Sequence, residues 1–159
     1  MPLETPDVVQ LEPQEALAIR GVVARDEIGG FLGEAFQEVA STAQESGLVI
    51  TGPPFAYYPE PPGDSITVDA GFPVSSPADP SGRARRLVLP GGAVVIATHV
   101  GHYDAIAQSY EDLERWVGDR GLTPGTSAWE TYVTDPDDEP DPAGWRTVIH
   151  CPLTGAEGP

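Results

Sequence analysis

Hydrophobic and polar positions recur along the chain with two different periods, which predict helices and strands. Apolar residues spaced three and four apart over residues 28–45 and 103–119 are typical of α-helices with one buried face. Shorter alternating or apolar runs predict strands at residues 8–11, 16–24, 54–58, 65–74, 87–89, 93–99, 128–134 and 145–151. The turn residues Pro90-Gly91-Gly92 predict a hairpin that joins strands 87–89 and 93–99.

The order of these elements repeats. A shift of 74 residues places Phe36 on Tyr110, Phe55 on Trp129 and Tyr58 on Tyr132, and Gly47-Leu48 on Gly121-Leu122. Neither half could cover its own sheet. We therefore expect one α+β domain over residues 1–159, built from two pseudo-symmetric βαββ-type halves that form a curved antiparallel sheet with two helices and a central pocket. The predicted parts are a first half at about 7–74, a linker at 75–82, a second half at about 83–152 and a tail at 153–159.

Charge and composition exclude several classes of function. The 159 residues include 25 acidic and 8 basic side chains, for a formal net charge of -17, so we expect no direct binding to nucleic acid. No run approaches the roughly 18 apolar residues of a membrane span. The N-terminus does not resemble a secretory signal, so we expect a cytoplasmic protein with no membrane partner. The single Cys151 and the scattered histidines do not have the spacing of metal ligands, and we expect neither a metal nor a cofactor.

The repeat is broken at one informative position. Alternation places Glu130 and Tyr132 on one face of their strand and Trp129 on the other, whereas the first half has Ala56 and Tyr58 at the positions equivalent to Glu130 and Tyr132. An acid among aromatic rings suits an aromatic or lipophilic cation, because the ring faces attract the cation and the acid neutralises it. Such surroundings also raise the pKa of a carboxyl group, which suits general acid–base chemistry. The pattern leaves open that Glu130 is a solvated strand residue.

Several short segments, taken in order, resemble GyrI-like small-molecule-binding domains. They are residues 52–58 and 69–74 in the first half, then 89–92, 99–103, Trp116, 121–122 and 129–132 followed by Asp135-Pro136 in the second. The resemblance covers about residues 8–152. It implies a duplicated βαββ fold with a central pocket for lipophilic, often cationic, aromatic compounds, and it places the acid of that pocket at Glu130.

The family that the chain resembles includes effector-binding domains of AraC- and MerR-type regulators, stand-alone and gyrase-inhibitory proteins, and hydrolases that open cyclopropane rings with pocket Glu and Tyr residues. The chain carries no helix-turn-helix pattern, so we expect a stand-alone member. The segment Gly101-His102-Tyr103 departs from the usual pattern, so His102 either faces the pocket or caps the helix that follows, and we expect the cap.

We therefore predict a pocket for lipophilic aromatic, cationic small molecules, in which Glu130 supplies the charge or the proton. The aromatic residues predicted to line it are Tyr132, Tyr58, Phe55, Trp129, Tyr103 and Trp145; alternation cannot place all of them on one face, so Phe55 and Trp129 are also candidates for the core. Two alternatives stay open. One is a hydrolase of strained rings in which Glu130 and Tyr132 are catalytic. The other is a protein-interaction module that binds a protein partner through its acidic surface.

Overall fold

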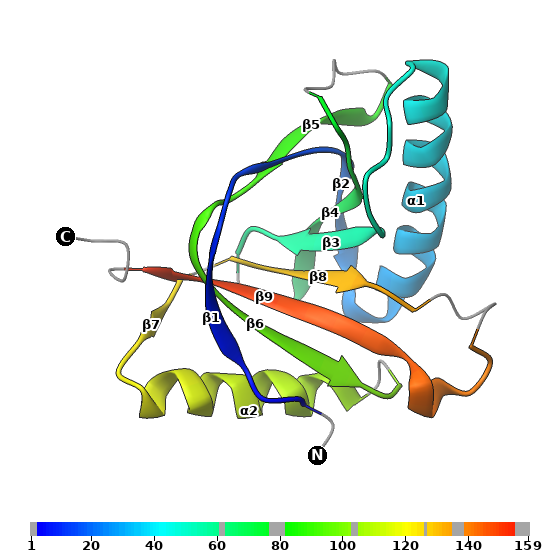
Figure 1. Cartoon of the computed structure of the whole chain (residues 1–159). Helices are drawn as coiled ribbons and strands as arrows, with labels where there is room; N and C mark the ends of the chain where they lie inside the picture. Colours follow the sequence, from blue (N-terminus) through cyan, green and yellow to red (C-terminus); the bar gives the residue numbers. More distant parts are fainter. Residues whose placement is uncertain are drawn as a thin grey trace. The chain divides into compact units, whose positions relative to one another are not determined.

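The computed structural model describes residues 3–60, 63–76, 82–102, 105–125, 127–134 and 139–154 (Figure 1). The chain divides into two compact units, one of Glu12–Pro90 and one of Met1–Leu11 with Gly91–Pro159. Each contains antiparallel strands and one long helix, and we name them the α1 unit and the α2 unit. The predicted α+β class with two helices and antiparallel strands is confirmed.

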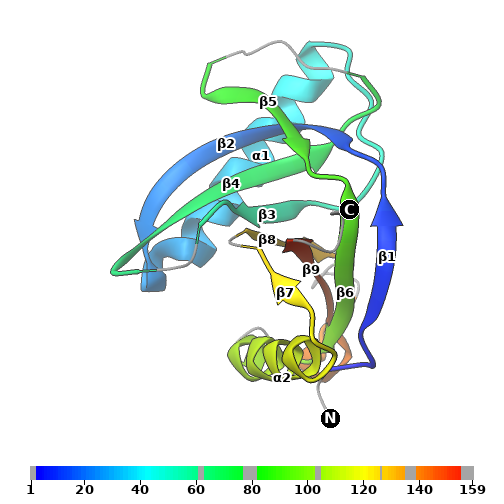
Figure 2. The same cartoon turned by 90° about the vertical axis from the view of Figure 1, so that its left-hand side faces the viewer.

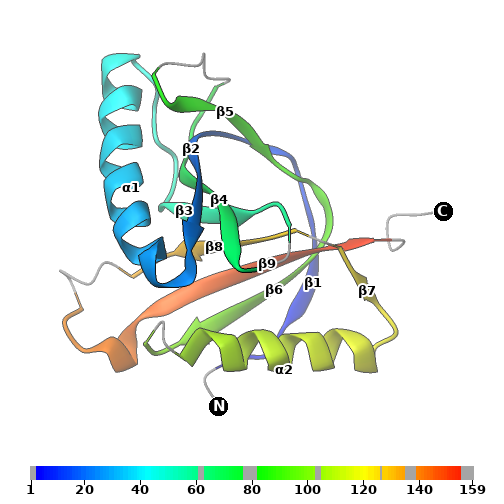
Figure 3. The same ribbon diagram turned by 180° about the vertical axis from the view of Figure 1, so that it is seen from behind.

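In the α1 unit, the strands lie in the order β3-β4-β2-β5 (Figure 2). Helix α1 buries Ala35, Val39 and Ala43, whose spacing of four places them on one stripe. That stripe packs with Leu17 and Ile19 of the neighbouring strand in one apolar core. Figure 3 shows α1 beside β2. The elements are β2 (Gln14–Ala24), α1 (Ile28–Glu45), β3 (Phe55–Tyr58), β4 (Ser65–Pro73) and β5 (Ala84–Leu89), with a 3-10 turn at Arg25–Glu27.

In the α2 unit, the strands lie in the order β1-β6-β9-β8, and the short strand β7 pairs with β9. Leu113 and Val117 of helix α2 are buried against Val95, Ala97 and Ile149 of the sheet. The elements are β1 (Asp7–Leu11), β6 (Gly92–Val100), α2 (Ile106–Asp119), β7 (Thr123–Pro124), β8 (Ala128–Tyr132) and β9 (Arg146–Thr154), with a 3-10 turn at Pro142–Gly144.

Both helices end in the same way, as the repeat predicts. Gly47 and Gly121 have φ values of 73° and 71°, a left-handed conformation that glycine adopts without strain. After α1 the amide of Leu48 donates to the carbonyl of Ala43, and after α2 the amide of Leu122 donates to that of Val117. These bonds satisfy carbonyl groups that the helix leaves unpaired, in the pattern of a Schellman motif. The matching Gly-Leu pairs therefore have one structural role in both units.

The pairing of the first strand of each half differs from the prediction. β1 pairs with β6 in the α2 unit, and β5 pairs with β2 in the α1 unit. Residues 7–11 therefore belong with the second half and residues 84–89 with the first, so the compact units depart from the predicted halves of 7–74 and 83–152.

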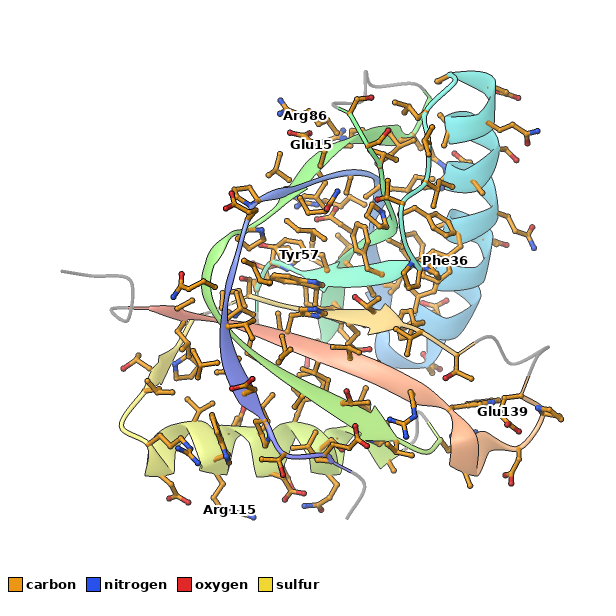
Figure 4. The ribbon with its side chains drawn as sticks, in the orientation of Figure 1. Glu15, Phe36, Tyr57, Arg86, Arg115 and Glu139 are labelled. Atoms are coloured by element: carbon orange, nitrogen blue, oxygen red, sulfur yellow. The ribbon has the colours of Figure 1, made fainter. Side chains whose placement is uncertain are left out.

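The hairpin predicted at Pro90-Gly91-Gly92 was therefore wrong. Its two strands bury their apolar faces in different cores: Ala84 of β5 packs in the core of α1, and Ala93 of β6 packs in that of α2. Bidentate hydrogen bonds from Arg86 of β5 to Glu15 of β2 add to the pairing of β5 within its own unit (Figure 4).

Two further differences are local. Helix α2 begins at Ile106 rather than at residue 103, and its N-cap residue is Ala105, so the prediction that His102 caps this helix was wrong. The ring of His102 stacks instead on Trp145, with ring centroids 5.4 Å apart. Neither helix of the described residues combines the length and the apolar character that crossing a membrane requires.

Candidate functional site

Buried polar side chains are concentrated in the α2 unit. Of the buried polar or charged residues in the described part of the chain, only Asp69 belongs to the α1 unit. The other four are His99, Ser109, Glu130 and Thr147. Buried polar groups cost free energy unless they are hydrogen-bonded. A cluster of them therefore indicates a candidate functional site rather than an ordinary part of the apolar core.

Glu130 is placed by the alternation of β8. It lies directly opposite Ile149 of β9, which packs in the core beneath α2, so its side chain shares the face that this helix covers. Tyr132, two residues further along β8, projects from the same face. Helix α2 supplies Tyr110 to that face from the turn that also carries Ser109.

Two tyrosine hydroxyls hold the carboxylate of Glu130. The Tyr110 hydroxyl donates to Oε2 at 2.6 Å, and the Tyr132 hydroxyl donates to Oε1 at 2.8 Å. The residue is only 7% exposed, whereas both tyrosines are half-buried. Each carboxylate oxygen therefore has one phenol donor, and one side of the acid is lined by aromatic rings.

The electrostatic state of Glu130 is set by burial. Desolvation raises the pKa of its carboxyl above the ordinary value of 4.5, against the weaker lowering effects of the two tyrosine hydrogen bonds and of His99. The chain has no lysine. Among the described residues, none of the arginine ion pairs includes Glu130. The acid is thus buried without an arginine or lysine partner in the described part of its own chain.

His99 connects the strand next to β9 with helix α2. Its Nε2 lies 3.0 Å from the carbonyl oxygen of His102, and its Nδ1 lies 2.6 Å from the hydroxyl of Ser109. A carbonyl can only accept, so Nε2 carries the hydrogen, and in the neutral ring Nδ1 accepts from Ser109. This link fixes the helix at the residue next to Tyr110.

Thr147 completes the buried group. It lies opposite His99 on one side and opposite Tyr132 on the other, because β9 runs between β6 and β8. Its hydroxyl is buried and has no hydrogen-bond partner among the described residues. Among the four buried polar residues of this unit, Thr147 is thus the one whose side chain makes no hydrogen bond to a described residue.

Two of the remaining predicted aromatic residues, Trp129 and Trp145, have other partners within the α2 unit. Trp129 stacks on His150, with ring centroids 4.7 Å apart. It lies on the face of β8 opposite to Glu130, as alternation predicts. Trp145 precedes β9, and its indole N–H donates to the Glu139 carbonyl at 2.7 Å. Tyr103 lies outside the described residues.

Two predicted residues belong to the α1 unit. Phe55 is 1% exposed and is part of the core. The sequence pattern had made it a candidate either for the pocket lining or for the core. Tyr58 is half-buried at the end of β3 and shares a face with Ala56 by alternation. These two positions repeat those of Trp129 and Tyr132 in the α2 unit.

Tyr110 was absent from the predicted site residues because it lies on the apolar stripe of its helix. A signal for it exists in the repeat, where Phe36 is the equivalent residue. Phe36 packs edge-on against Phe72, with ring centroids 5.9 Å apart. From the α1 unit to the α2 unit, Phe36 is replaced by Tyr110 and Ala56 by Glu130, and these two replacements are hydrogen-bonded to each other.

The site combines a buried acid with two phenol groups. Within the described ranges, no three His, Cys, Asp or Glu side chains are grouped so that they could hold a metal ion. A buried acid beside phenol groups can neutralise a cation or exchange a proton. Cys151 is unsuited to nucleophilic chemistry, because desolvation, with smaller contributions from Glu114 and Glu130, raises the pKa of its thiol to about 12.

Solved structures share this fold. The C-terminal domain of EcmrR matches with a TM-score of 0.80 at 21% identity, over 94% of this chain and 96% of that domain. EcmrR in its complex with DNA matches with a TM-score of 0.79 at 21% identity over 96% of this chain, which spans 58% of that longer chain. SAV2435 bound to tetraphenylphosphonium matches with a TM-score of 0.65 at 13% identity, over 97% of this chain and 96% of that one. At such identities the likeness shows the fold alone.

The sequence matches no curated protein. Its residues 4–153 match the family model of the GyrI-like small molecule binding domain, which is most of the chain. The resemblance seen in the motifs is thereby confirmed, and the chain belongs to the family of GyrI-like small molecule binding domains.

Proposed function

We propose that this protein binds lipophilic aromatic cations and that Glu130 is the residue that neutralises their charge. The observation that carries the proposal is the state of that acid: it is 7% exposed, its two oxygens accept from tyrosine hydroxyls, and no described arginine pairs with it. A buried carboxylate is costly until a positive charge joins it. A cationic ligand supplies that charge.

The neighbouring rings suit the rest of such a ligand. Tyr110 and Tyr132 orient their hydroxyls toward the acid, which leaves their rings as apolar surface beside it. Aromatic rings attract cations that have lost their hydration. SAV2435, which shares the fold, is bound in its solved structure to tetraphenylphosphonium, a lipophilic aromatic cation.

A fluorescence titration with tetraphenylphosphonium and with (2-naphthylmethyl)ammonium tests the proposal. We expect Glu130→Gln to weaken binding of both cations at least about tenfold, which corresponds to a loss of about 1.4 kcal/mol. Glu111→Gln is the matched control, because it removes the same charge from an exposed position on α2 and should change affinity less than about twofold by screening. Equal binding by wild type and Glu130→Gln, or no binding of either cation, contradicts the proposal.

Hydrolysis of a strained or electrophilic ring is the second candidate. It is favoured by the raised pKa of the Glu130 carboxyl, because a base with a raised pKa takes a proton from water more readily. The hydroxyls of Tyr110 and Tyr132 are proton donors at the same place. Incubation with a cyclopropane-bearing alkylating compound, followed by mass spectrometry, distinguishes the two: a hydrolase consumes the compound with addition of water and loses this activity in Glu130→Gln, whereas a binding protein leaves it intact.

A further inference from the structure

We propose that the cation bound at Glu130 carries N–H donors, as a primary or secondary ammonium or an amidinium does, and that one of them hydrogen-bonds to Thr147. This inference rests on the proposed function and specifies the class of ligand for the same site. It makes Thr147 a specificity-determining residue that separates N–H cations from fully substituted ones.

The strand register places Thr147 beside the acid. Thr147 lies opposite Tyr132, and Glu130 lies opposite Ile149, so Thr147 and Glu130 are diagonal neighbours on the face beneath α2. Diagonal positions in an antiparallel sheet are about 7–8 Å apart, or somewhat less between Cβ atoms. This spacing is long for a direct hydrogen bond, and the structure contains none between the two side chains.

The separation suits a nitrogen atom with two or more hydrogens. One N–H of an ammonium donates to the carboxylate at about 2.8 Å, and a second donates to the threonine oxygen at a similar distance. A quaternary ammonium or a phosphonium has no hydrogen to donate, so it satisfies the charge of Glu130 but leaves the hydroxyl of Thr147 unpaired.

The hydroxyl of Thr147 is available because its neighbours are already engaged. Both ring nitrogens of His99, on one side, are hydrogen-bonded to Ser109 and to the His102 carbonyl. The hydroxyl of Tyr132, on the other side, donates to Glu130. A buried hydroxyl without a partner is unfavourable, so a ligand that satisfies it gains affinity, and one that buries it unsatisfied does not.

A matched pair of ligands tests the inference. (2-Naphthylmethyl)ammonium and (2-naphthylmethyl)trimethylammonium share the ring and the charge and differ only in their N–H groups. We expect the wild type to prefer the N–H member at least about fivefold, a discrimination in the range of one hydrogen bond. Thr147→Val keeps the shape of the side chain and should reduce the preference to less than twofold, whereas Thr147→Ser should retain it.

Each outcome has a distinct meaning. Equal affinity of the wild type for the two ligands, or a preference that survives in Thr147→Val, overturns the role of Thr147. If both ligands still depend on Glu130 in that case, the proposed function stands. If neither ligand shows Glu130-dependent binding, the proposed function itself fails.

The thermal stability of the ligand-free protein checks the premise. If the Thr147 hydroxyl has no partner, Thr147→Val removes an unsatisfied group and leaves the melting temperature unchanged or higher. A lower melting temperature would mean that a buried water or another group already satisfies the hydroxyl, and this result would overturn the inference.

Discussion

Among the described residues, each of the two units buries one carboxylate, and they stabilise it in opposite ways. In the α1 unit, Asp69 is 4% exposed and accepts two hydrogen bonds of 2.9 Å from Arg20, its direct cross-strand partner. The pairing raises the pKa of Arg20, chiefly through the hydrogen bond to Asp69. In the α2 unit, Glu130 has two phenol hydroxyls and no described arginine.

This difference distinguishes an acid with a structural role, Asp69, from an acid that can bind a cationic ligand, Glu130. Asp69 already has its cation, so an additional positive charge gains little there. Glu130 has two phenol donors that orient it but no described arginine beside it, so an external cation completes the group. Burial of a carboxylate is therefore a weak sign of a binding site by itself, and the charge of its partners is the stronger one.

The largest effect is expected when the structural pair is broken. Arg20→Met leaves Asp69 buried without a cation and should lower the free energy of unfolding by about 2 kcal/mol, less than the 3–5 kcal/mol of fully buried pairs because half of the Arg20 side chain is exposed. Urea denaturation measures it. Glu130→Gln should cause no loss, and a loss there as large as that of Arg20→Met would remove the distinction between the two acids.

Tyr110→Phe makes the α2 unit resemble the α1 unit, where Phe36 holds the equivalent position. The variant removes the donor at 2.6 Å, so the ionised form of Glu130 loses about 1.5–3 kcal/mol of hydrogen bonding to a charged group. We expect the affinity for cations to fall about three- to tenfold because the acid is harder to ionise. Phe36→Tyr is the converse control, and fluorescence titration should find that it leaves affinity unchanged.

The pH dependence follows from the raised pKa of Glu130. Its folded-state pKa lies above the ordinary value of 4.5, so the folded protein holds this proton more tightly than the unfolded chain does. The contribution of this group to stability is therefore fully present below 4.5 and is lost as the pH rises through the folded-state pKa. Cation affinity should change in the opposite direction and increase over that range, because only the ionised acid attracts the ligand.

Calorimetric titrations at several pH values measure the cation affinity, and urea denaturation at the same pH values measures the stability. Glu130→Gln is the reference in both experiments. The reference variant should show neither trend. An affinity of the wild type for cations that does not change with pH would mean that Glu130 is already fully ionised over the range tested.

The smallest effect concerns Cys151, which reports on the charge of Glu130. Burial, with contributions from Glu114 and Glu130, raises the pKa of the thiol to about 12, so alkylation by iodoacetamide at pH 8 should be slow until the protein unfolds. Glu130→Gln should accelerate it slightly, by about two- to threefold, or a few tenths of a pKa unit. Asp69→Asn is the comparison, because that residue does not contribute to the pKa of Cys151.

The sequence predicted most of the elements because local signals carry them. The glycines that end both helices, the apolar stripe of α1 and the alternation of β8 all act over a few residues. Alternation was sufficient to put Glu130 and Tyr132 on one face and Trp129 on the other.

Strand partners and buried polar contacts were harder to predict. The pairing of β1 with β6 depends on which of two apolar cores the strand covers, and both cores have the same pattern. Tyr110 resembles any aromatic residue on a helix stripe until its hydroxyl is seen to reach Glu130. Likewise, His99 and Thr147 are ordinary strand residues in the sequence, and only the register brings them to the same place.

The most direct test of the central claim is an NMR titration of the Glu130 side-chain carboxyl carbon, without ligand and with saturating tetraphenylphosphonium. We expect a pKa above 4.5 in the ligand-free protein, because burial disfavours the charged carboxylate, and a fall in that pKa when the cation binds. A pKa at or below 4.5 in the ligand-free protein, or a value that saturating cation leaves unchanged, would contradict that claim.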